Sequence, residues 1–203
     1  MRVLDEGIKN PAKYENIPPF TKDEVKSALD FVIEKMRGNL AVFTDKFPAA
    51  ASVDNVYPAV ENQCWTSSFW TGMLWLAYEY TGDEIFKKSA EIQCKSFKNR
   101  IEKGIAVDHH DLGFLYTLSC VAGYKLTGNE EMKETALKAA DKLITRYKEK
   151  GQFIQAWGAV DDPEAYRLII DCMMNVPLLY WASGVTGDKK YFEIAKNHAY
   201  TSL

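Results

Sequence analysis

The sequence has few of the patterns that mark a β-protein, a membrane protein or a nucleic-acid-binding protein. Strand-like alternation is nearly absent, and no apolar run reaches the roughly 18 residues that a membrane span needs. The 25 basic and 28 acidic residues are interspersed, with a net charge of −3. No basic patch could neutralise phosphates. We therefore expect neither nucleic acid nor a membrane among the partners of this chain.

The sequence has few cysteines, and their spacing forms no recognisable motif. Cys64, Cys94, Cys120 and Cys172 show no CxxC spacing, which argues against a metal or redox motif. Three of them lie in apolar or aromatic surroundings, where reduced core thiols are common. The first residues lack the apolar segment of a secretory signal. We expect a cytoplasmic protein without disulfides, large enough at 203 residues to bury one good core.

A helical joint is repeated three times. Thr-Gly-Asp or Thr-Gly-Asn occurs at 81–83, 127–129 and 186–188. Glycine can end one helix in the left-handed conformation, and the following Asp or Asn can cap the next helix. An apolar helix precedes each joint and an amphipathic helix follows it, and an earlier amphipathic helix starts at the capping box Thr21–Glu24. The expected inner helices cover 69–77, 112–124 and 172–182, and the outer helices cover 21–36, 86–101, 132–147 and 191–199.

This alternation predicts an all-α fold in which inner helices are enclosed by outer ones, as in an α/α toroid. A closed ring of six hairpins holds twelve helices, and the chain supplies about seven, so we expect an incomplete toroid. Its open edge would expose apolar faces of the inner helices, which self-association could cover.

The repeat also predicts where a site lies. Counting back from the joint threonines, Trp65 and Asp111 each stand sixteen residues before their joint, and Asp171 stands fifteen before its own. These residues should lie at the same end of three inner helices and face one cavity. Long loops precede them, and such loops often carry function.

Asp171 lies in an uncharged run, Leu168–Met174. Apolar surroundings disfavour the ionised form of a carboxyl group, which suits a general acid or base. The structural alternatives are a helix N-cap or an ion pair with Arg167. Asp111 is open to the same N-cap interpretation.

Asp111 ends the run Asp108-His109-His110-Asp111, which invites a metal-site interpretation. Adjacent residues do not normally all reach one ion, and helical His-x3-His spacing is missing, so we expect no metal. Trp65, Phe114 and Trp157 lie in or beside the loops that precede the inner helices. Sugar rings pack on aromatic planes, so these residues near carboxylates favour a carbohydrate site over plain core packing.

Four segments together resemble the unsaturated glucuronyl hydrolases, glycoside hydrolase family 88. They are Asn62–Trp70, Asp108–Phe114, Gln155–Gly158 and Ile170–Asn175. The resemblance implies an (α/α)6 barrel, with residues 1–20 as an N-terminal extension and 21–203 as the N-terminal half of the catalytic domain. It also implies activity without a metal or organic cofactor.

The family acts on oligosaccharides made by polysaccharide lyases, whose terminal uronic acid has a C4=C5 double bond, and hydrates that bond. By resemblance, Asp171 is the general acid/base and Asp111 the second essential carboxylate. His110, Trp65, Phe114 and Trp157 are the sugar-contacting residues.

Family members are about twice this length, so the chain alone is expected to be weakly active or inactive. Two alternatives stay open: an unsaturated rhamnogalacturonyl hydrolase, and a non-catalytic half-barrel that oligomerises or binds sugar.

Overall fold

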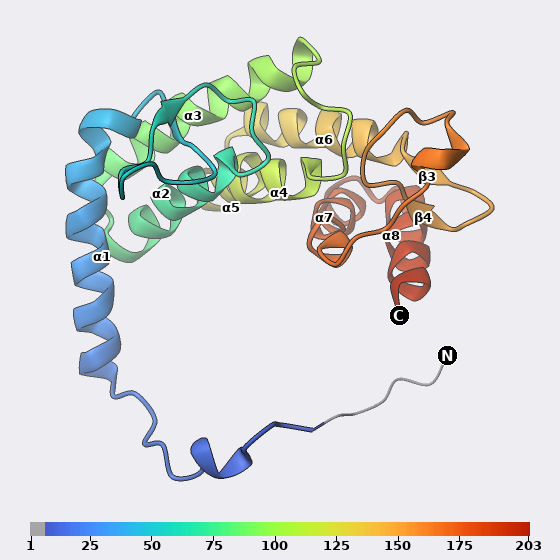
Figure 1. Cartoon of the computed structure of the whole chain (residues 1–203). Coiled ribbons are helices and arrows are strands. Elements are labelled where there is room, and N and C mark those ends of the chain that lie inside the picture. The colour runs from blue at the N-terminus through green and yellow to red at the C-terminus, as the bar shows by residue number, and fades with distance from the viewer. Residues whose placement is uncertain (1–6) are drawn as a thin grey trace. The chain divides into compact units, whose positions relative to one another are not determined.

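The computed structural model describes residues 7–203 and divides the chain into two compact units, Met1–Gly38 and Asn39–Leu203. The first unit contains the 3-10 turn Pro11–Lys13 and most of helix α1, Lys22–Phe43 (Figure 1). The predicted capping box is formed at the start of α1. The backbone N–H of Thr21 donates to Glu24 Oε2 (2.8 Å), and the N–H of Glu24 donates to Thr21 Oγ1 (3.2 Å).

The second unit is built from helical hairpins. Helix α2 packs on α3, and the rod formed by α4 and α5 packs on α6. Helix α7 packs on α8 and also contacts α6. Within residues 7–203, no helix is both long and apolar enough to cross a bilayer. The bounds are α2 Ser67–Thr81, α3 Glu84–Glu102, α4 Leu112–Tyr116, α5 Ala122–Thr127, α6 Glu130–Ile144, α7 Pro177–Thr186 and α8 Lys189–Ser202.

All three predicted joints are confirmed. Gly82, Gly128 and Gly187 end α2, α5 and α7 with φ of 69°, 69° and 75°. The next residue caps the following helix in each case, for example Asp83, whose carboxylate accepts from the N–H of Ile85 at 3.0 Å. The joints therefore set the alternation of inner and outer helices, as the sequence predicted.

Some helix bounds were predicted wrongly. The inner helix expected at 112–124 contains a π-helical segment, Thr117–Val121, between α4 and α5. The one expected at 172–182 is a short 3-10 turn, Cys172–Met174, followed by α7, because Pro177 suits the first turn of a new helix. The outer helix expected at 132–147 ends at Ile144.

Two short antiparallel ribbons lie between the helices. Strand β1 (Phe47–Pro48) pairs with β2 (Ala59–Val60), and β3 (Tyr147–Lys148) pairs with β4 (Phe153–Ile154). The second ribbon follows α6 directly and opens the loop that leads toward the start of α7. The rest of this connection contains two 3-10 turns, Pro163–Ala165 and Cys172–Met174.

The core of the second unit is apolar, and all four cysteines are free, as expected. The inner helix α2 is nevertheless not buried on every face. Phe69, Met73, Leu76 and Tyr80, at helical spacing, are each at least 40% exposed. A groove of about 400 Å³ runs beside the first three of them, between α2 and the α4–α5 rod. This is the exposed apolar face that an incomplete toroid predicts.

Candidate active site

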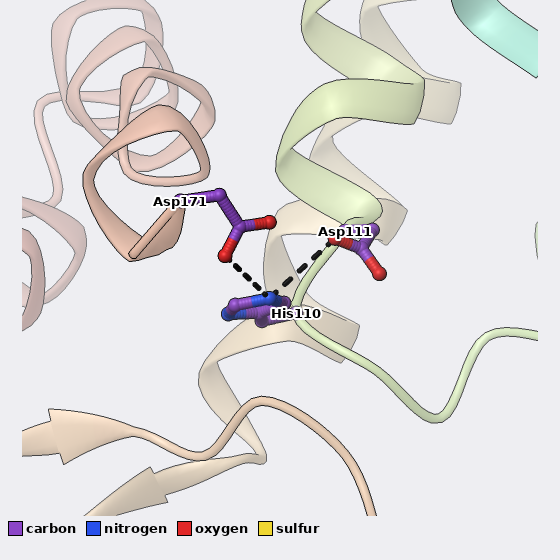
Figure 2. A group of neighbouring side chains, drawn as sticks. All are labelled: His110, Asp111 and Asp171. Carbon is purple, nitrogen blue, oxygen red and sulfur yellow. Dashed lines mark ion pairs between the residues drawn. The ribbon is translucent and has the colours of Figure 1, made fainter. Parts of the chain in front are cut away.

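Two carboxylates and a histidine meet where the inner helices begin. Asp111 immediately precedes α4, and Asp171 immediately precedes the turn that leads to α7. The Nε2 atom of His110 lies 3.5 Å from Asp111 Oδ1 and 3.5 Å from Asp171 Oδ1. Figure 2 shows the imidazole between the two carboxyl groups. Residues sixty positions apart in the sequence thus share one site, because successive inner helices present the same end to it.

Neither carboxylate is used as a helix cap. Asp111 and Asp171 occupy N-cap positions, yet neither side chain accepts a capping hydrogen bond. Arg167 donates to the carbonyls of Glu164 and Ala165, at 3.1 and 3.3 Å, instead of to Asp171. Asp171 Oδ1 is buried without a hydrogen-bond partner. Neither carboxylate therefore serves as a helix cap, and Asp171 is not paired with Arg167. Both carboxylates remain available to a ligand.

His110 is buried in the site. Its side chain is buried, and its backbone N–H donates to the carbonyl of Ala156 at 2.8 Å. Burial lowers the pKa of His110, while the nearby charges of Asp111 and Asp171 oppose that shift. The neutral imidazole is therefore favoured by burial and the charged one by its two acidic neighbours.

His109 supports Asp111 from the other side. Its Nε2 atom lies 2.8 Å from the carbonyl oxygen of Ala106, so this nitrogen must carry the hydrogen. Its Nδ1 atom lies 3.0 Å from Asp111 Oδ2.

An aromatic cluster includes Phe114, in the first turn of the helix that Asp111 precedes. The ring centroids of Trp65 and Phe114 are 5.9 Å apart, and Phe69 lies 6.2 Å from Trp65 and 5.6 Å from Phe114. Phe114 is buried, whereas Trp65 and Phe69 are half-exposed. The sequence missed Phe69, although its position one helical turn after Trp65 was a usable signal.

Trp157 stands apart from this cluster in its ring contacts. The Arg167 guanidinium lies 5.4 Å from the Trp157 ring centroid, and the ring is 42% exposed. The preceding residue, Ala156, is the one whose carbonyl binds His110, which places the Trp157 loop beside the site through its backbone. The structure thus links Trp157 to the site but does not bring its ring into the Trp65 cluster.

Two buried arginines, which the sequence analysis missed, brace the loops of the site. Arg100 donates to the carbonyls of Gln63, Cys64 and Ala106, and to Asn62 Oδ1. Arg146 donates to the carbonyls of Gln155 and Gly158.

The repeat contained a signal for these arginines. Arg100 and Arg146 are 46 residues apart, the same spacing as the first two joint threonines. Each arginine lies near the end of an outer helix. Its hydrogen bonds hold a loop that carries a half-exposed tryptophan.

Only part of the Asp108–Asp111 run converges. Asp108 pairs with Lys142 at 2.7 Å, and this partner lowers the pKa of Asp108. The atoms that could ligate an ion come instead from His110, Asp111 and Asp171, and lie within 4.8 Å of one another. One imidazole nitrogen and two carboxylate oxygens could bind a divalent cation. The expectation that no metal takes part stays a prediction.

The profile of the family described as Glycosyl Hydrolase Family 88 matches residues 33–202. The chain belongs to this family. It is similar to the unsaturated chondroitin disaccharide hydrolase of Streptococcus pneumoniae, with 52% identity over 201 residues, which cover 99% of this chain and 51% of the relative. It is also 45% identical, over 165 residues, to the unsaturated glucuronyl hydrolase of Bacillus sp. (strain GL1), covering 81% of this chain and 44% of that one.

The fold agrees with the family assignment. A crystal structure of unsaturated glucuronyl hydrolase from Streptococcus agalactiae superposes with a TM-score of 0.96 and 48% identity, covering all of this chain and 51% of that chain. The predicted family and the predicted α/α-barrel type are therefore confirmed. The chain spans about half the length of the curated family 88 relatives that it matches.

Proposed function

We propose that this chain supplies the acid/base half of a hydrolase that removes a 4,5-unsaturated uronic acid from the non-reducing end of an oligosaccharide. The observation that carries the proposal is the pair of carboxylates on either side of His110, free of capping and of arginine. Protonating an alkene carbon needs an acid at short range, and these two carboxyl groups are placed to supply it.

Asp171 is the proposed acid. Its proton goes to C4, the C4=C5 π electrons form the new C–H bond, and positive charge develops at C5 and the ring oxygen. Water then adds to C5 and returns a proton to the Asp171 carboxylate. The hemiketal opens by breaking the bond between C5 and the ring oxygen, which leaves a ketone at C5. The remaining sugar then leaves from the hemiacetal at C1.

Asp111 and His110 have supporting roles in this proposal. Asp111 orients the substrate hydroxyl groups and adds a second negative charge near the developing cation. His110 lies between the two acids and fixes their separation through its buried ring. Trp65 and Phe114 supply the aromatic surface for the sugar rings, and Trp157 contributes from its neighbouring loop.

A chondroitin-type disaccharide is the proposed substrate. The relative from Streptococcus pneumoniae, at 52% identity, is named for unsaturated chondroitin disaccharide. A mutant of the Streptococcus agalactiae enzyme, at 41% identity, has been crystallised in complex with dGlcA-GalNAc6S. A heparin-specific relative is only 26% identical. Four free cysteines fit a reducing cytoplasmic location, and we propose that setting.

The exposed apolar stripe on α2 supports the second half of the proposal, that this chain needs a covering partner for full activity. Phe69 belongs both to that stripe and to the aromatic cluster of the site. A site wall that is open to solvent leaves one side of the sugar without the protein contacts that would hold it in position for the reaction. Self-association, or the rest of the family's barrel, would cover it.

The test follows loss of the ultraviolet absorbance of the C4=C5 bond in an unsaturated chondroitin disaccharide. We expect turnover by the chain alone to be at least roughly 100-fold below that of a full-length relative, since removing part of a preorganised site costs about that much. Adding the separately produced second half of a relative should raise it. Asp171→Asn should abolish the gain, whereas Asp108→Asn, a control at a carboxylate that pairs with Lys142, should leave it.

Full turnover by the monomeric chain would contradict the need for a partner. Retained turnover in Asp171→Asn would contradict the acid assignment. Faster hydrolysis of an unsaturated rhamnogalacturonan disaccharide would favour the pectin alternative instead.

A further inference from the structure

The first turn of helix α4 is capped by a residue from a different segment of the chain. The N–H groups in the first turn of a helix have no intrahelical acceptor, and an N-cap Asp normally accepts from the second or third of them. The N-cap residue here is Asp111, and it makes no such bond. The N–H of Phe114, the third residue of α4, donates instead to Asn175 Oδ1 at 3.1 Å, in the buried interior.

Gly113 allows the capping residue to come this close. A Cβ atom at Gly113 would lie 2.2 Å from the carbonyl oxygen and 2.3 Å from the Cα of Asn175. Both are backbone atoms, which cannot rotate aside. Gly113 has no positive φ, so its role is to leave space and not to permit an unusual conformation. The first turn of α4 therefore lies directly on the backbone of Asn175.

Asn175 belongs to the segment that carries Asp171. Three residues separate the two positions, and they form a single 3-10 turn, Cys172–Met174. The Asn175 side chain is 1% exposed. The contact thus fixes the start of the Asp111 helix against the loop of the other carboxylate.

We propose that Asn175 and Gly113 are positioning residues, with Asn175 capping α4 in place of Asp111 so that the Asp111 carboxylate stays turned toward His110 and Asp171. The orientation of Asp111 supports this. Its two oxygens face the imidazoles of His109 and His110, at 3.0 and 3.5 Å, and not the N–H groups of its own helix. The meaning of this arrangement for catalysis rests on the proposed function, but the arrangement itself does not.

Two substitutions separate the capping bond from the bulk of the side chain. Asn175→Ala removes the acceptor, and the Asp111 carboxylate, which stands at the N-cap position, should then rotate away from His110 to accept from the N–H of Phe114. Asn175→Asp keeps an oxygen at that place and should preserve the orientation. Gln93→Ala is the matched control, because Gln93 is also a fully buried amide, bound to the carbonyls of Phe43 and Lys46.

His110 provides a readout that loss of stability alone does not move. The chain has three histidines, so the imidazole signals can be assigned by single substitutions and followed by NMR as the pH changes. Burial lowers the pKa of His110, Asp111 and Asp171 raise it, and His109 and Arg146 lower it. Moving a carboxylate away from contact with an imidazole lowers the titration midpoint of that histidine by about 1 pH unit.

We expect the His110 midpoint in Asn175→Ala to fall as far as it does in Asp111→Asn, and the double variant to show no further fall. Asn175→Asp and Gln93→Ala should not lower it. A wild-type midpoint in folded Asn175→Ala would overturn the proposal, as would a full additional fall in the double variant. If Asn175→Ala does not fold, a lowered midpoint in Asn175→Asp would overturn it. Substrate turnover enters none of these outcomes, so a failure here is distinct from a failure of the proposed function.

Discussion

Gly113→Ala is the sharpest test of how the two carboxylates are brought together. The added methyl group would lie 2.2 Å from the carbonyl oxygen of Asn175, whereas non-bonded atoms need about 3.5 Å. One backbone must therefore move by roughly 1 Å, which separates the start of α4 from the Asp171 segment. Overpacking of this kind costs about 1–3 kcal/mol, more than the helix propensity of about 1 kcal/mol that alanine adds.

Gly184→Ala is the matched control for this prediction. Gly184 lies within α7, and a Cβ atom there would have nothing within 4 Å. The same substitution should then stabilise the protein, by about 0.5–1 kcal/mol. Urea unfolding followed by circular dichroism measures both. Equal effects of the two substitutions, or a Gly113→Ala protein as stable as wild type, would refute the close backbone contact.

Two further predictions concern buried charged or titratable groups outside the carboxylate pair. His198 Nδ1 accepts from the N–H of Ile154 at 2.9 Å, and burial lowers its pKa. The folded state then binds the proton more weakly than the unfolded chain, so the unfolding free energy should fall as the pH drops from about 6.5, and less so in His198→Gln. Arg100→Met leaves several buried carbonyls unpaired and should cost at least about 3 kcal/mol. Lys98→Met removes an exposed ion pair with Glu131 and should cost less than about 1 kcal/mol in the same denaturant titration. A flat pH profile, or equal costs of the two Met substitutions, would contradict these accounts.

The order of the helices could be predicted because local chemistry fixes it. Gly128 followed by Asn129 ends one helix and caps the next whatever surrounds them, so the sequence alone is enough. The π-helical segment Thr117–Val121 has no such local signal. It depends on how the α4–α5 rod packs on α6 and on α2, and α2 lies more than thirty residues earlier in the sequence.

The candidate site could be predicted in part for the same reason. Asp111 and Asp171 follow the repeat, so the counting rule found them. Asn175 and Gly113 could not be found in this way, because their roles exist only once two segments meet. The sequence offered an N-cap role for Asp111, and the structure assigns that hydrogen bond to Asn175. The roles predicted for the site residues stay predictions until they are measured.

The most direct test of the central claim is the titration of His110 in Asp111→Asn and in Asp171→Asn, with Asp108→Asn as the control. Because Nε2 lies 3.5 Å from an oxygen of each carboxylate, each of the first two substitutions should lower the His110 midpoint by about 1 pH unit. Because Asp108 pairs with Lys142, Asp108→Asn should leave the His110 midpoint unchanged. If only one of the two carboxylates moves the midpoint, the pair does not share a site, and the proposed hydration loses its acid/base centre.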